Sequence, residues 1–163
     1  MLCRHRACPQ KVGRRHRHVC CRHLLSLCRH RARAEKIVGG SIGKQMHMTI
    51  DEATEGRCIV RMPTNGAVQN EAGRVHGGAI TALIDNAATA AAWAYKGLGK
   101  DAWGTTISLT CNFLDAGQNA DLIADARVKR RGRSTVFVEI NVSDAENRDI
   151  AQGLVTYKLS PGA

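Results

Sequence analysis

One stretch of helix-forming residues, 77–95, lies between segments that favour strands, and this contrast constrains the fold more than any other feature. Two glycines open the stretch, alanine dominates it and no proline interrupts it, which predicts one long helix. Gly97 follows closely and is expected to cap its C-terminal end. At 3.6 residues per turn, one apolar stripe is expected to face the core: Ile80, Leu83, Ile84, Ala87, Ala91 and Ala94.

Short runs with strand character flank this helix on both sides and are separated by turn residues. A single long helix amid about six antiparallel strands predicts an α+β fold in which one curved sheet wraps the helix. Cys58 and Cys111 fall within these strand patterns and are expected to be core thiols. The expected strands are Met46–Glu52, Arg57–Met62, Trp103–Leu114, Asp121–Arg130, Ser134–Ser143 and Ile150–Leu159.

The first 36 residues differ in composition from the rest of the chain. They hold eleven basic residues and a single acidic residue, Glu35, whereas residues 37–163 hold thirteen of each sign, so the formal net charge of +10 lies entirely in the first segment. We therefore divide the chain into a basic, Cys-, His- and Arg-rich tail, 1–36, and one domain, 37–163. The sequence contains no run of about 18 uninterrupted apolar residues, which argues against a membrane-spanning helix.

The basic tail fits several functions, each incompletely. An arm for nucleic acid would use its arginines, but no aromatic residue is present to stack on a base. Its cysteines and histidines lack the paired short spacings of a zinc site. A transit peptide would be richer in serine, and a secretory signal needs a longer apolar stretch. We expect a disordered tail or translated sequence upstream of the true start, with Met46 and Met48 as later candidate starts.

A polar stripe interrupts the otherwise apolar predicted helix. Thr81, Asp85 and Thr89 are spaced four residues apart and therefore lie on one face. Periodicity alone leaves three interpretations open: the stripe faces water, Asp85 is a structural hydrogen-bond acceptor, or Asp85 is a catalytic carboxylate. His76-Gly77-Gly78 precedes the helix, and free N–H groups at a helix start suit a developing oxyanion.

The pattern Asn70-x5-His76-Gly77-Gly78-x6-Asp85-x3-Thr89 resembles the signature of the hotdog-fold thioesterases, with the phenylacetate-degradation and 4-hydroxybenzoyl-CoA types as the nearest kin. Residues 105–117 resemble that family's next strand, and residues 130–134 resemble its following hairpin. The resemblance covers roughly residues 38–160. It implies a hotdog fold, in which two subunits join sheet to sheet and active sites lie at their interface.

The resemblance also implies roles for individual residues. Gly77 would donate its backbone N–H to the thioester carbonyl oxygen, and Asp85 of the partner subunit would be the nucleophile or the general base. Asn70 would orient the water or the carbonyl, and His76 would hold the loop and hydrogen-bond near the carbonyl. Further expected site residues are two hydroxyls that position water, Thr89 and Thr106, and a hairpin that binds the phosphates of coenzyme A, Arg131, Gly132, Arg133 and Ser134.

We therefore expect a cytoplasmic homodimer or homotetramer that hydrolyses acyl-CoA thioesters without a cofactor or metal. A non-catalytic acyl-CoA-binding protein of the same fold is the alternative. A hotdog dehydratase needs a His and acid pattern that we do not find, and no Gly-x-Ser-x-Gly nucleophile motif is present. The sequence leaves open the acyl group, the choice between coenzyme A and acyl-carrier protein, and the choice between attack and proton abstraction by Asp85.

Overall fold

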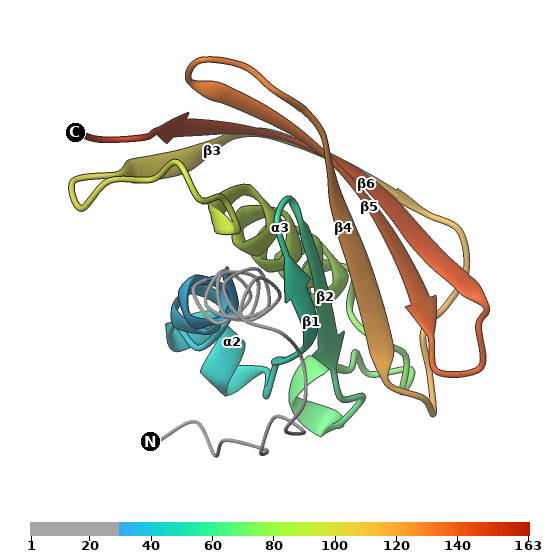
Figure 1. Ribbon diagram of the computed structural model, residues 1–163. Coiled ribbons are helices and arrows are strands. Elements are labelled where there is room, and N and C mark those ends of the chain that lie inside the picture. Colours follow the sequence, from blue (N-terminus) through green and yellow to red (C-terminus); the bar gives the residue numbers. More distant parts are fainter. Residues whose placement is uncertain (1–29) are drawn as a thin grey trace, which may run out of the picture.

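The computed structural model describes residues 30–163, which form one six-stranded antiparallel sheet curved around a long helix (Figure 1). Helix α3, Gly77–Trp93, lies against the concave face of the sheet. The strands follow the order β1-β2-β4-β5-β6-β3. This arrangement confirms the predicted α+β hotdog fold. The strands are β1 Thr49–Thr54, β2 Arg57–Met62, β3 Trp103–Phe113, β4 Leu122–Arg131, β5 Thr135–Asp144 and β6 Asp149–Ser160.

Strands β2 to β6 begin and end within one residue of the predicted segments, but β1 does not. It starts at Thr49, because the short helix α2, Ser41–Gln45, ends at a C-cap on Met46 and the chain then turns at His47 with φ 53°. The predicted turn after β1 is present: Gly56 adopts φ +75°, a conformation that glycine reaches without strain. The helix α2 precedes the β1–β2 hairpin, and a 3-10 helix, Gly66–Val68, follows it.

The core lies between α3 and the sheet. All six residues of the predicted apolar stripe on α3 are buried, as are alternate residues of β5 from Val136 to Val142. Helix and sheet approach closely at Gly153 of β6, where a Cβ atom would lie 2.6 Å from the Ile84 side chain. Packing of this kind, rather than helix propensity alone, holds α3 in place.

Residues 30–38 form a helix that packs on the domain, so helical structure crosses the boundary that we drew after residue 36. Ala34 is fully buried, and Arg33 donates hydrogen bonds to the carbonyls of Tyr95 and Leu98 in the loop after α3. The rest of the predicted tail lies outside the described residues, and its disorder stays a prediction. No helix among residues 30–163 is long and apolar enough to cross a membrane.

The C-terminal end of α3 differs from the prediction. The helix ends at Trp93 with Ala94 as its C-cap, so the expectation that Gly97 caps it is wrong. Two other donors satisfy the last carbonyls: Arg131 Nη2 bonds to the Ala92 oxygen at 2.8 Å, and the Gly56 N–H bonds to the Ala94 oxygen at 2.8 Å. A β4 arginine and the β1–β2 turn therefore hold this end of the helix.

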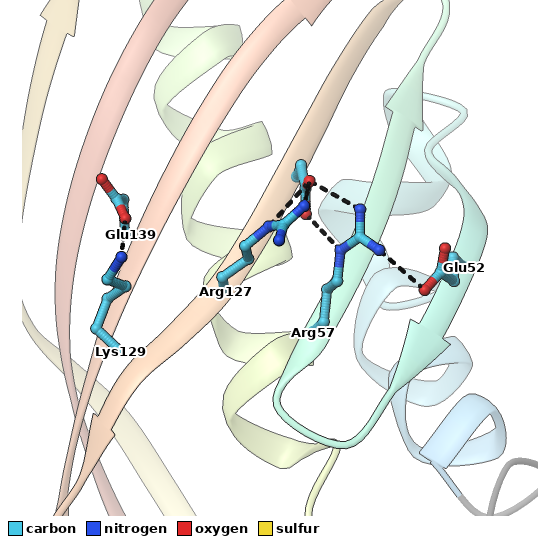
Figure 2. A network of polar contacts seen from close by, with 6 residues as sticks. Glu52, Arg57, Arg127, Lys129 and Glu139 are labelled. Atoms are coloured by element: carbon cyan, nitrogen blue, oxygen red, sulfur yellow. Dashed lines mark hydrogen bonds and ion pairs between the residues drawn. The ribbon is translucent and has the colours of Figure 1, made fainter.

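Paired charges cover part of the outer face of the sheet (Figure 2). Arg57 of β2 donates to both carboxylate oxygens of Asp125 at 2.9 Å and to Glu52 of β1 at 3.2 Å. Arg127 also reaches Asp125, at 2.8 Å. Burial alone would raise the pKa of Asp125, but the hydrogen bonds from the two arginines together outweigh it and the pKa falls below its usual value. These pairs tie β1, β2 and β4 together.

Candidate active site

One stripe of α3 stays half-exposed while most of its neighbours are buried. It consists of every fourth residue: Gly77, Thr81, Asp85, Thr89 and Trp93. Helix α3 contacts β2 and β4 more extensively than β3, and two residues of β3, Thr106 and Phe113, lie against this stripe. The stripe therefore runs beside β3. The interpretation of a purely water-facing stripe does not hold, because β3 and β6 supply hydrogen-bonding partners to it.

The start of α3 offers a backbone donor. His76 is the N-cap, and its Nδ1 accepts a hydrogen bond from the Gly78 N–H at 2.9 Å, which places the proton of the neutral ring on Nε2. Its backbone N–H donates to the Val68 oxygen at 2.8 Å, so His76 also anchors the preceding loop. Among residues 30–163 the Gly77 N–H has no acceptor. This free N–H at the positive end of the helix dipole suits an oxyanion.

An aromatic ring borders this donor. A Cβ atom on Gly77 would lie 3.2 Å from Cζ of Phe113, the last residue of β3, so glycine lets the ring approach the helix start. The Phe113 side chain is itself exposed. The apolar Phe113 ring thus lies beside the Gly77 N–H, where it would shield a bound carbonyl from water.

Asp85 is held from β3 by Thr106, whose Oγ1 donates to Asp85 Oδ1 at 2.6 Å. A β-bulge interrupts the β3–β6 register between Thr106 and Ser108, and bulges commonly re-aim a side chain beside a functional site. Oδ2 of Asp85 has no hydrogen-bond partner within the described chain. One carboxylate oxygen is therefore fixed and the other is available to a substrate or a water molecule.

Beyond Asp85 the stripe is closed by Tyr157 of β6. The Trp93 Nε1–H donates a hydrogen bond to the Tyr157 hydroxyl at 3.0 Å. Burial raises the pKa of Tyr157, and the nearby Asp85 carboxylate adds to this effect. Sequence reasoning missed both ends of this contact. Extending the four-residue spacing from Thr89 would have found Trp93, but no local signal marks Tyr157.

Asn70 lies in an exposed loop and is engaged locally. Its Oδ1 accepts hydrogen bonds from the backbone N–H groups of Ala72 at 3.0 Å and Arg74 at 3.1 Å, which shapes the loop before the helix. Only the Nδ2 group remains to face a substrate. Within residues 30–163 of one subunit, Asn70 makes no hydrogen bond to Gly77 or Asp85.

The hairpin between β4 and β5 separates its residues into two groups. Arg131 is half-buried, bonds to the end of α3 and lies 4.2 Å above the Tyr95 ring; burial lowers the pKa of its guanidinium. Gly132, Arg133 and Ser134 are exposed at the tip. Arg131 thus bonds within the protein, whereas the exposed tip of the hairpin is free to bind an anion.

Neither described cysteine is placed as a nucleophile. Cys58 is fully buried, as expected for a core thiol, and burial raises its pKa to about 12. Cys111 is half-buried beside Thr81 rather than in the core, and burial raises its pKa as well. Within the described residues no group of three or more His, Cys, Asp or Glu side chains could hold a metal ion.

A six-stranded antiparallel sheet curved around one long helix defines a hotdog fold. The chain belongs to the thioesterase superfamily, whose family model matches residues 72–151. A relative named "Putative esterase" from Halobacterium salinarum is 31% identical over 121 residues, which span 69% of this chain and 80% of the relative. The chain is thus a thioester hydrolase by family.

Solved structures show the same fold. The PaaI protein of the Escherichia coli phenylacetic acid degradation operon superposes with a TM-score of 0.74 at 20% identity, covering 84% of this chain and 99% of PaaI. A hypothetical thioesterase from Streptococcus pneumoniae, crystallised with coenzyme A, superposes with a TM-score of 0.64 at 22% identity, covering 70% of this chain and 89% of its own. At these identities the likeness establishes the fold.

Proposed function

We propose that the protein hydrolyses acyl-CoA thioesters to a free acid and coenzyme A, with Asp85 and the Gly77 N–H at its active site. The observation that carries this proposal is the half-exposed stripe of α3, which presents a free backbone donor and a partly free carboxylate along one open edge of the sheet. Thioester hydrolysis needs those two groups: one stabilises negative charge on the carbonyl oxygen, and the other attacks or activates water.

In the proposed reaction the carbonyl oxygen accepts a hydrogen bond from the Gly77 N–H, beside Phe113. Thr106 fixes Oδ1 of Asp85, and Oδ2 either attacks the carbonyl carbon or takes a proton from an attacking water. If Oδ2 attacks, the carbon–sulfur bond breaks to leave a mixed anhydride on Asp85 and the thiolate of coenzyme A, and water then hydrolyses the anhydride, releasing the acid and supplying the proton that the thiolate takes up. If water attacks instead, Asp85 takes its proton, the carbon–sulfur bond breaks, and that proton passes to the thiolate of coenzyme A as the acid is released. His76 Nε2–H and Asn70 Nδ2 are side-chain donors in the segment before the helix, and Thr89 lies one turn beyond the carboxylate.

The spacing along α3 supports a site shared between two subunits. Eight residues of helix separate Gly77 from Asp85, a rise of about 12 Å, so the two groups of one subunit are too far apart to act on the same carbonyl. A second copy paired along β3 would bring its own Asp85 towards Gly77. We therefore propose a homodimer, or a tetramer built from such dimers, as the active form.

We propose coenzyme A as the carrier. The exposed tip of the β4–β5 hairpin supplies Arg133 and free backbone groups for its phosphates, and Arg131 would act by fixing the hairpin to α3. The related Streptococcus pneumoniae protein was crystallised with coenzyme A, which supports this choice. A cytoplasmic location stays a prediction.

The test is thiol release from a panel of short, medium, long and aromatic acyl-CoAs. Asp85→Asn should lower kcat by about a thousandfold, because the amide neither attacks nor accepts a proton. Asp101→Asn, which changes an exposed aspartate outside the stripe, is the matched control and should leave turnover unchanged. Saturable acyl-CoA binding without turnover in the wild-type protein would favour the non-catalytic binding protein instead.

A further inference from the structure

We propose that Tyr95 is a positioning residue for coenzyme A, because it fixes the β4–β5 hairpin whose tip is the proposed phosphate site. This inference rests on the proposed function and deepens it. Tyr95 lies two residues after the end of α3, and the Arg131 guanidinium lies over its ring, 4.2 Å from the ring centroid. The ring therefore contacts the residue that directly precedes the exposed tip.

Arg131 joins the hairpin to the helix by two contacts. Its Nη2 donates to the Ala92 oxygen at 2.8 Å, and its guanidinium lies over the Tyr95 ring. One hydrogen bond alone lets a long side chain pivot, whereas the added contact with an aromatic face fixes the guanidinium itself. Arg131 ends β4, and the Gly132 N–H donates to the Thr135 oxygen at 2.7 Å, so the short tip follows the position of Arg131.

The loop that carries Tyr95 is itself held in place. Arg33, from the helix of residues 30–38, donates hydrogen bonds to the carbonyls of Tyr95 and Leu98, the latter at 2.9 Å. Gly97 leaves room for the ring, because a Cβ atom there would lie 2.6 Å from a carbon of the Tyr95 ring. The ring is therefore fixed both through its backbone and by close packing, as a positioning group must be.

The proposed substrate is long and would be bound at both ends. Its thioester would lie beside Asp85 of α3, and its phosphates would lie at the hairpin tip. Because Arg131 and Tyr95 join the end of α3 to the hairpin, their contact sets the spacing between these two parts of the site. Loosening this contact should weaken binding of the nucleotide end and leave the chemistry at the thioester unchanged.

The decisive experiment compares two substrates with the same acyl group, one on coenzyme A and one on pantetheine, which lacks the nucleotide and every phosphate. Tyr95→Leu removes the aromatic face and keeps an apolar side chain. It should raise KM for the acyl-CoA about tenfold and change kcat less than about twofold. Turnover of the acyl-pantetheine should stay unchanged, whereas a general structural defect would lower turnover of both substrates alike.

Tyr95→Phe is the matched control, because it keeps the ring and removes only the hydroxyl. It should retain the wild-type KM for the acyl-CoA, since the face of phenylalanine also attracts a guanidinium. Urea unfolding of each variant checks that the fold is retained. Arg33→Met, which removes both hydrogen bonds to the loop, carries the test if Tyr95→Leu does not fold, and should raise KM for the acyl-CoA alone, by about threefold.

The outcomes separate this inference from the proposed function. An unchanged KM for the acyl-CoA in Tyr95→Leu, an equal loss on both substrates, or the same rise in Tyr95→Phe overturns the positioning role, while turnover by the wild-type protein upholds the proposed function. Equal wild-type KM values for the two substrates overturn the phosphate site at the tip and with it the role of Tyr95. Absence of wild-type turnover on every thioester overturns the proposed function itself.

Discussion

The two edges of the sheet are built differently. Strand β1 has six residues, two of them acidic, and the helix of residues 30–38 lies beside it, with Arg31 donating to the Ile50 oxygen at 3.4 Å. Strand β3 has eleven residues without a single charge or proline, and it leaves the large apolar side chains of Trp103, Ile107 and Phe113 exposed. Both strands pair on one side only.

This difference shows which edge is prepared for a partner. Charges, short length and a covering helix are devices that protect an edge strand from pairing with another chain, and β1 has all three. Strand β3 has none of them, and the open stripe of α3 runs along it. Under the proposed function, folding within one subunit depends on the β1 edge and catalysis between two subunits on the β3 edge, so each edge can be tested separately.

A charge on the open edge should have the largest effect. Ile107, at the β3 bulge, is 58% exposed, so Ile107→Asp should leave the subunit folded and disrupt pairing with a second copy. We expect a monomer in sedimentation velocity and a loss of thioester turnover of about a thousandfold, since the proposed site needs the partner's carboxylate.

Thr49→Asp places the same charge on an exposed residue of β1 and is the matched control. It should change neither the assembly nor the turnover. A dimeric, fully active Ile107→Asp protein, or an active monomer, would show that β3 is not the interface on which activity depends.

Removing the backbone donor should have the next largest effect. Gly77→Pro eliminates the N–H at the first helical position, where proline is well tolerated. His76 already has the extended backbone that a residue before proline requires, with φ −65° and ψ 135°. We expect kcat to fall about a hundredfold with the helix retained by circular dichroism.

Gly77→Ala adds the same Cβ atom beside Phe113 but keeps the N–H. Comparing the two variants therefore distinguishes the loss of the hydrogen-bond donor from steric crowding by the added atom. Mixing Gly77→Pro and Asp85→Asn subunits sharpens the comparison further. A shared site predicts recovered activity, because each mixed dimer contains one site with both groups intact, whereas sites confined to single subunits would give none.

Shortening the chain to begin at Met46 tests the opposite edge. It removes the helix of residues 30–38, exposes core contacts of Ala34 and Val38, and takes away the Arg33 bonds to the loop after α3. We expect a loss of about 3 kcal/mol or more in the free energy of unfolding, measured with urea. Unchanged stability would mean that the domain needs neither this helix nor α2, which the same truncation removes.

Local patterns predicted much of this molecule. Helical periodicity placed the core face of α3 and the stripe that carries Asp85, because burial follows the 3.6-residue repeat directly. Alternation placed five strands within one residue. The start of β1 was not predictable in this way, since α2 and the turn at His47 replace the strand pattern at Met46.

Local sequence patterns could not predict contacts between segments that are far apart in the chain. The bond between Trp93 and Tyr157 joins residues 64 positions apart, and only the β3–β6 register brings Tyr157 beside Thr106. The sequence predicts Arg131 as a phosphate ligand, and that role stays a prediction. The structure adds that Arg131 bonds to the Ala92 carbonyl near the end of α3, where it does part of what was predicted for Gly97. A side chain's charge is visible in a sequence, whereas its direction depends on the fold around it.

The smallest effect should come from the paired charges beside β1 (Figure 2). Because Arg57 and Arg127 hold the pKa of Asp125 below 3.8, the charged form contributes stability above that value, and the contribution is lost as the pH falls through the lowered native pKa. Asp125→Asn should therefore cost under about 1 kcal/mol near pH 7, as expected for a partly exposed pair, and nothing once the pH has fallen through the lowered native pKa. Urea unfolding of both proteins across this range measures the difference. A constant difference at all pH values would assign the effect to side-chain packing instead of charge, and turnover at the β3 edge should stay unchanged throughout.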